Sequence, residues 1–145
     1  MVYKTAWKSG ACITADAEKV SAEIQSIGVS ATPEQIVKKA TAKRSELNKC
    51  FVWDDTAAGK LYRIQQARHI AASIIIYEEP EKEDTEPEYI VRAFENVKVN
   101  GGRAYVAIED VMSDEEQRAE VFAGIMSAIK ALGKKIESYE KMFPE

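Results

Sequence analysis

The spacing of apolar residues in the first half of the chain predicts short helices. One begins near Asp16 and ends before Gly28, where a glycine commonly terminates a helix. Its apolar side chains share one face: Val20, Ile24 and Ile27. A second helix is predicted to begin at Thr32, because Thr32-Pro33-Glu34-Gln35 has the spacing of a capping box with proline in the first turn.

A third and longer helix is predicted from about residue 56 to residue 74. The apolar segment Cys50–Trp53 leads into Asp54 and Asp55, whose carboxylates are expected to cap this helix. Five of its side chains are expected to point inward: Ala57, Leu61, Ile64, Ala71 and Ile74. Three basic side chains are expected to be more exposed: Lys60, Arg63 and Arg68. The β-branched run that follows predicts a strand at residues 74–77.

The centre of the chain predicts a loop and a β-hairpin. Residues 78–88 contain two prolines and no large apolar side chain, which is typical of a flexible loop. Residues 89–109 predict a hairpin around Asn100-Gly101-Gly102, because asparagine and glycine tolerate the positive φ values of a tight turn. The whole pattern predicts an α+β fold in a single domain, 1–145. Its parts are a mainly helical half (1–74), a small antiparallel sheet of about three strands and a long carboxy-terminal helix.

That last helix is predicted at residues 113–143, beginning in a capping box at Ser113 and ending before Pro144. Its large apolar residues alternate at steps of three and four, the pattern of a coiled-coil seam. They are Phe122, Ile125, Ile129, Leu132, Ile136, Tyr139 and Phe143. Two interpretations stay open. Either the stripe packs across the protein's own sheet and helices, or it joins two copies of the chain in a homo-oligomer.

The charge of the chain is unevenly distributed. The net charge of −4 combines +4 in residues 1–77, −6 in residues 78–88 and −2 in residues 89–145. An acidic total therefore does not exclude a nucleic-acid-binding amino half. Cys12 and Cys50 show no CxxC spacing, which favours reduced packing thiols. No apolar stretch is long enough for a membrane span, and no signal peptide is evident, so we expect no membrane partner.

No residue pattern indicates a catalytic, metal or cofactor site, and we expect a protein that is not an enzyme. His69 is the only histidine, and the sequence lacks metal-ligand and phosphate-loop motifs. Asp54-Asp55 and Glu109-Asp110 resemble a pair of carboxylate sites. Neighbouring carboxylates at a helix start do not converge on one point, however, and capping accounts for them.

Basic residues in the amino half suggest an alternative use, the binding of nucleic-acid phosphates. The candidates are Lys38, Lys39, Lys43, Arg44, Arg63 and Arg68. Two short helices before a longer one, and a hairpin that would serve as a wing, fit the same interpretation. The competing interpretation is a basic face that is simply solvated.

The residues around the predicted corner carry a resemblance to a known group of proteins. Leu47, Phe51 and Trp53-Asp54-Asp55 precede a helix with Tyr62-Arg63 and Gln66-Ala67-Arg68. This pattern resembles a family of small, uncharacterised bacteriophage and prophage proteins. Val52 departs from it, since a glutamate is more usual there. The resemblance implies phage origin and a location in the host bacterial cytoplasm or the virion, but no activity.

These observations together predict a non-enzymatic accessory protein that binds a macromolecule. A nucleic-acid-binding or regulatory module is the first hypothesis. A protein inhibitor of a host enzyme or defence system, docking through the acidic loop or an apolar patch, is the second. A structural or assembly component of the virion is the third. The partner is accordingly nucleic acid or a host or phage protein, and no cofactor is expected.

Overall fold

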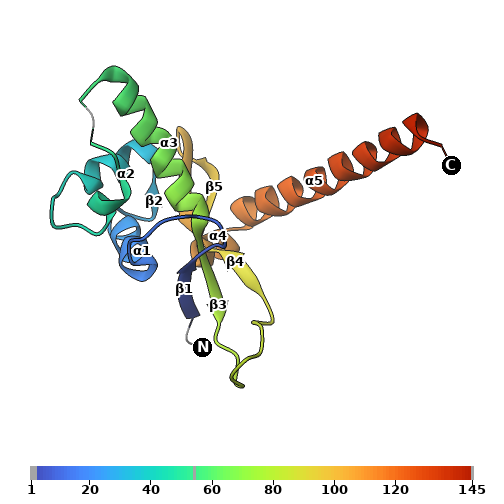
Figure 1. The fold of residues 1–145 in the computed structure, drawn as a ribbon, viewed down its shortest axis with the longest axis horizontal. Helices are drawn as coiled ribbons and strands as arrows, with labels where there is room; N and C mark the ends of the chain where they lie inside the picture. The colour runs from blue at the N-terminus through green and yellow to red at the C-terminus, as the bar shows by residue number, and fades with distance from the viewer. Residues whose placement is uncertain (1–2, 54, 145) are drawn as a thin grey trace.

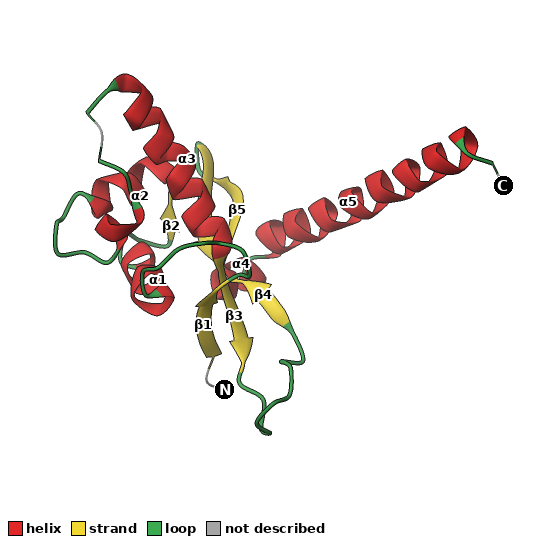
Figure 2. Ribbon diagram, viewed as in Figure 1, coloured by secondary structure: helices red, strands yellow, loops and turns green. Residues whose placement is uncertain are grey.

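The structure is a computed structural model that describes residues 3–53 and 55–144 (Figure 1). The predicted α+β class is confirmed, with helices and two small antiparallel sheets (Figure 2). In chain order the elements are β1 (Tyr3–Trp7), α1 (Ala17–Gln25), β2 (Ser30–Ala31), α2 (Pro33–Ala40), a 3-10 turn η1 (Leu47–Cys50), α3 (Ala57–Ser73), β3 (Ile74–Glu78), β4 (Ile90–Arg92), β5 (Phe94–Val99), β6 (Gly102–Ala107), α4 (Ile108–Ser113) and α5 (Glu115–Met142).

The strands form two sheets where the sequence predicted one. The first has the order β1-β3-β4 and the second the order β2-β6-β5. The predicted first strand of the hairpin divides at Ala93, so that its two parts pair in different sheets. The amide of Ala93 donates to the Ile74 carbonyl at 2.9 Å, and its carbonyl accepts from the Ile108 amide at 2.9 Å. Two further strands were missed because five and two residues carry too little pattern: β1, which pairs with β3, and β2, which pairs with β6.

The predicted hairpin is confirmed, but its strands begin at Phe94 and end at Ala107 and so are shorter than the predicted residues 89–109. β5 and β6 pair in the register Phe94 with Ala107 through Val99 with Gly102. The positive φ expected at the turn is present at Gly101, with a value of +83°, but not at Asn100. Ile108 and Glu109, predicted as strand, begin α4 instead.

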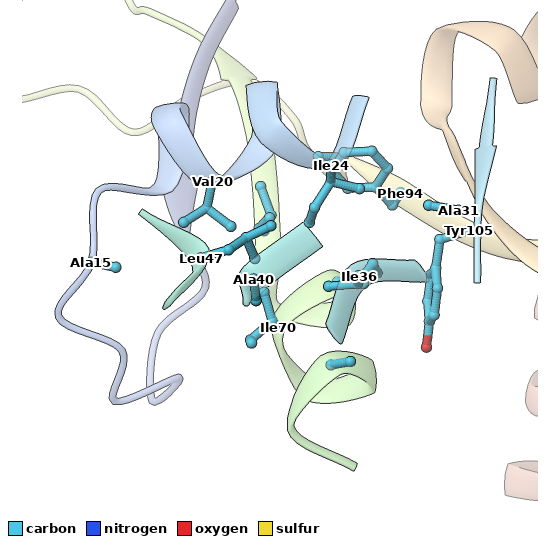
Figure 3. Packing of buried hydrophobic residues seen from close by; sticks show 14 of the residues in the cluster. Ala15, Val20, Ile24, Ala31, Ile36, Ala40, Leu47, Ile70, Phe94 and Tyr105 are labelled. Carbon is cyan, nitrogen blue, oxygen red and sulfur yellow. The ribbon is translucent and has the colours of Figure 1, made fainter. Parts of the chain in front are cut away.

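Apolar side chains from α1, α2, η1 and α3 meet the second sheet in one core (Figure 3). Figure 3 shows Val20, Ile24 and Leu47 facing Ile36 and Ile70, with Phe94 and Tyr105 on the sheet side. The inward face predicted for the first helix is confirmed for Val20 and Ile24. Because η1 contributes Leu47, the segment between α2 and α3 is packed into the core.

Helix starts follow the sequence signals closely, with two shifts. The capping box of α2 is present in both directions, with 3.2 Å from the Gln35 amide to Thr32 Oγ1 and 2.9 Å from the Thr32 amide to Gln35 Oε1. α3 is capped by Thr56 Oγ1, which accepts from the Gly59 amide at 3.0 Å, and not by Asp55. Asp54, the other predicted cap, lies outside the described residues. α5 is capped by Asp114 in place of Ser113, whose hydroxyl donates to the Glu109 carbonyl inside α4.

The predicted faces of α3 were partly wrong. Ala71 and Ile74 are buried as expected, but Leu61 is 72% exposed and Ala57 is exposed, while Arg63 is only 7% exposed. The reason is that α3 packs through small residues, including Gly59, Ala67 and Ala71, which carry little periodic signal. Figure 1 shows the first turns of α3 extending beyond α2, and the side chains of Ala57, Ala58 and Leu61 on that outer part are exposed.

The acidic segment connects β3 to β4, and it lies at the bottom of the view in Figure 1. Its first predicted residue, Glu78, belongs to β3, where it pairs with Tyr3. Helix α5 leaves the body near α4 and projects away from it to the right (Figure 1). From Phe122 to Phe143 every side chain of this helix and its cap is exposed, so the interpretation in which the stripe packs across the protein's own sheet or helices is wrong.

We predict that the two leucines of this region differ sharply in their effect on stability. Leu47→Ala removes a fully buried side chain and is expected to lower the free energy of unfolding by roughly 2–5 kcal/mol. Leu61→Ala, the matched control on α3, is expected to change it by less than about 0.5 kcal/mol. Denaturant unfolding followed by circular dichroism measures both, and equal losses would contradict the described orientation of α3.

Candidate functional site

Four of the six basic residues proposed from the sequence lie together, and we name them the basic edge: Lys38, Lys39, Lys43 and Arg44. Ile36 and Ala40 face the core from α2, which places Lys38 and Lys39 on the solvent side of its last turn. Lys43 and Arg44 follow in the exposed segment after α2. Within residues 3–53 and 55–144, none of the four makes an ion pair. The basic edge is therefore available to an anionic partner.

The remaining two candidates, Arg63 and Arg68, lie on α3 and not on α2. Arg63 is nearly buried, with Nη1 donating to the Val52 carbonyl at 3.3 Å and the guanidinium 5.2 Å from the centroid of the Trp53 ring. It therefore stabilises the segment before α3. Arg68 is exposed near Tyr105: burial raises the pKa of the Tyr105 hydroxyl, and the charge of Arg68 partly opposes that effect.

Helix α3 does not have the arrangement of a recognition helix. In a helix-turn-helix, three or four residues separate the two helices, whereas residues 41–56 separate α2 from α3. Gln66 is already engaged, because its Oε1 accepts from the Val52 amide at 3.2 Å. Arg63, Gln65, Gln66 and Arg68 are the polar side chains of α3 that could read base edges. With Arg63 also engaged, Gln65 and Arg68 are the two of them that stay exposed.

The hairpin is not a free wing either. Glu120 at the root of α5 accepts from the Lys98 amide at 3.0 Å and pairs with Arg103 at 2.6 Å. Arg103 also donates to Asn96 Oδ1 at 2.9 Å. The Lys98 amide, followed by Arg103, lowers the pKa of the Glu120 carboxyl below its usual value. These contacts attach the hairpin to α5.

The residues that carry the resemblance form a braced corner. Leu47 and Phe51 are buried, and the Trp53 indole donates to the Asn48 carbonyl at 3.1 Å. Asn48 in turn donates to the Ala40 carbonyl at 2.9 Å and so satisfies a carbonyl at the end of α2. Glu23 of α1 accepts from the amides of Glu46 and Leu47 at 2.8 and 2.9 Å. These residues have structural roles in the described corner, and the phage relationship itself stays a prediction.

A shallow cavity beside α3 contains the residues closest to a catalytic set: His69, Cys50 and Cys12. His69 Nε2 lies 3.0 Å from the Ala11 carbonyl, and the Ser73 hydroxyl donates to the His69 carbonyl at 2.5 Å. Burial raises the pKa of the Cys50 thiol to about 11, which disfavours a nucleophilic thiolate. Across the described part of the chain, no three His, Cys, Asp or Glu side chains are placed to hold a metal ion.

Two apolar surfaces lie on the other side of the molecule. One is the stripe on α5, made of the seven residues proposed from the sequence, each between 50% and 68% exposed. The second is a groove of about 460 Å³ between the first sheet and the root of α5. Tyr3, Ile76 and Val91 line its sheet side, and Phe122 and Ile125 line its helix side. The groove and the stripe are therefore continuous through Phe122 and Ile125.

Comparison with known proteins identified no relative: no family model, curated protein or solved structure matches this chain. A search of the described helices for a membrane span found none with sufficient length and apolar character.

We predict that the two thiols differ in reactivity. With a pKa of about 11, Cys50 has about one thiolate in a thousand at pH 8, so its alkylation is expected to be slow and to accelerate about tenfold per pH unit up to pH 10. Cys12 is exposed and is expected to react first. Rates for Cys12→Ser and Cys50→Ser with iodoacetamide measure each thiol separately. Fast reaction of the Cys12→Ser variant at pH 8 would contradict the described burial.

Proposed function

We propose that this protein binds nucleic acid without catalysing a reaction, through contacts from the basic edge to backbone phosphates. The observation that carries the proposal is the group of four exposed cations without ion pairs in the described residues. Exposed lysine and arginine side chains without ion pairs bind the phosphates of nucleic acid, and the release of condensed counterions favours this binding.

The distribution of acidic residues supports this use of the basic edge. The acidic segment that gives the chain its negative total follows β3, at the bottom of Figure 1, whereas α2 lies on the upper left. A phosphate backbone approaching α2 thus meets positive charge and avoids the acidic segment. Repulsion between like charges would otherwise weaken the complex.

The proposed contacts are to the phosphates of the nucleic acid and not to its bases. Arg63 and Gln66 are engaged with the corner, and the hairpin is attached to α5. Few polar side chains remain to contact base edges, which are the source of sequence specificity. We therefore propose binding with little sequence preference, in keeping with an accessory role in the phage or prophage setting that the resemblance implies.

We predict that the double variant Lys38→Ala/Lys39→Ala binds nucleic acid with lower affinity. Its affinity is also expected to depend less steeply on the salt concentration. Each phosphate contact contributes about 0.9 to the slope of log K against log salt for duplex DNA, so the slope is expected to fall by about 2. Lys130→Ala/Lys134→Ala removes the same charge from α5 and is the matched control. Fluorescence anisotropy of a labelled duplex between 50 and 200 mM salt measures the affinity of both double variants. In this range of salt concentration, binding through phosphate contacts changes strongly enough to give a slope.

Two results would contradict this proposal. One is the absence of binding by the unmodified protein at the lowest salt concentration. The other is an equal loss in both double variants, which would mean that net charge alone, and not the basic edge, determines binding.

A further inference from the structure

The apolar stripe of α5 lacks a packing partner within the described chain. Its seven residues extend from Phe122 to Phe143, and all are at least half exposed. Large side chains in this state present on the order of 100 Å² each, so the stripe presents on the order of 700 Å². This exceeds the 300–600 Å² or so of the largest apolar patch on a typical monomer and approaches the ~800 Å² that each partner buries in a standard interface.

The composition of the projecting helix also indicates a partner. Gly124 and Gly133 lie inside it, and each costs about 1 kcal/mol relative to alanine in an unsupported helix. Isolated helices gain little stability from propensity alone, and in proteins most of it comes from packing of an apolar face. The part of α5 beyond Val121 obtains no such packing from the body of its own chain.

We propose that the stripe is covered by α5 of a second copy of this chain, as an antiparallel two-stranded coiled coil. With the a and d positions of one helix facing the d and a positions of the other, six of the seven stripe residues pair with one another, and Phe143 extends past them toward the root of the second helix. Phe122 faces Tyr139 of the second copy, Ile125 faces Ile136, and Ile129 faces Leu132. Each layer occurs twice because the pair is symmetric.

The groove at the root of α5 favours the antiparallel orientation. Phe122 and Ile125 form its helix side, and the sheet residues Ile76 and Val91 stand opposite them. In an antiparallel pair the tip of the second helix, with Met142 and Phe143, reaches this groove and brings no folded body with it. In a parallel pair, the two roots would meet here and would bring both bodies to the same end.

One ion pair favours the parallel orientation, but it contributes less stability than burial of the helix tip in the groove. Lys135 and Glu140 occupy g and e positions five residues apart, the spacing at which oppositely charged residues pair across a parallel coiled coil. Such an exposed ion pair contributes little to stability. Burial of the aromatic tip in an apolar groove outweighs it, since each large apolar side chain contributes several times more.

The first test is the mass of the full chain in solution, by sedimentation equilibrium. We expect twice 16.2 kDa, retained at high salt because the interface is apolar. Leu132→Asp places a charge in the seam and is expected to weaken the dimer on the order of 100-fold or more. Ala131→Asp, one position away on the outer face, is the matched control and is expected to remain dimeric.

A monomer at micromolar concentration, or equal effects of the two aspartate variants, would overturn the proposal, and so would a trimer or larger assembly. Misfolding is controlled for by tryptophan fluorescence, because both tryptophans, Trp7 and Trp53, belong to the body and not to α5. The mass is independent of nucleic-acid binding, so failure here and failure of the proposed function are distinguishable.

The second test determines orientation, by distances between nitroxide labels in a Cys12→Ser/Cys50→Ser background. Labels at Lys130→Cys lie near the centre of the pair and are expected to be close in either orientation. Labels at Lys141→Cys are expected to lie about 30 Å apart along the axis in the antiparallel pair, from a rise of 1.5 Å per residue. A short distance at both positions would show a parallel pair and overturn the proposed orientation.

Discussion

The arrangement of the whole molecule depends on the backbone at Ala93, where one extended segment passes from the first sheet to the second. Its amide bonds to the Ile74 carbonyl at the junction of α3 and β3, and its carbonyl bonds to the Ile108 amide at the start of α4. Ala93 is itself buried, and buried backbone groups must be paired. These two bonds therefore join the end of α3, the two sheets and the start of the carboxy-terminal helices at one point.

The crossing at Ala93 also determines where the apolar groove and the stripe on α5 lie. Because β4 pairs with β3 while β5 pairs with β6, the two sheets diverge after Ala93. The first sheet then provides one wall of the apolar groove, and α4 leads α5 to the other wall. Glu120 holds that root against the hairpin. The stripe on α5 is thus directed away from the core by the fold and not by any property of the stripe.

In the amino half, an irregular segment between α2 and α3 is packed against the core. Glu23, Asn48 and Trp53 satisfy backbone groups there, while Leu47 and Phe51 enter the core. Arg63 is used in this corner, which is why a residue proposed for phosphate contact is unavailable. The basic edge keeps its charge exposed because α2 buries only a narrow face. Arg63 of α3 thus has a structural role, whereas the four cations of the basic edge stay exposed.

The sequence by itself determined the elements whose signals are local. The capping box at Thr32, the hairpin around Asn100-Gly101-Gly102 and the long carboxy-terminal helix each follow from residues a few positions apart, and the structure confirms all three. Only the tertiary structure decided the pairing of β1 and β2, the division at Ala93, the inward position of Arg63 and the exposure of Leu61. Those outcomes depend on which distant segments pack together, and small residues such as Ala67 and Ala71 leave almost no periodic trace of that packing in the sequence.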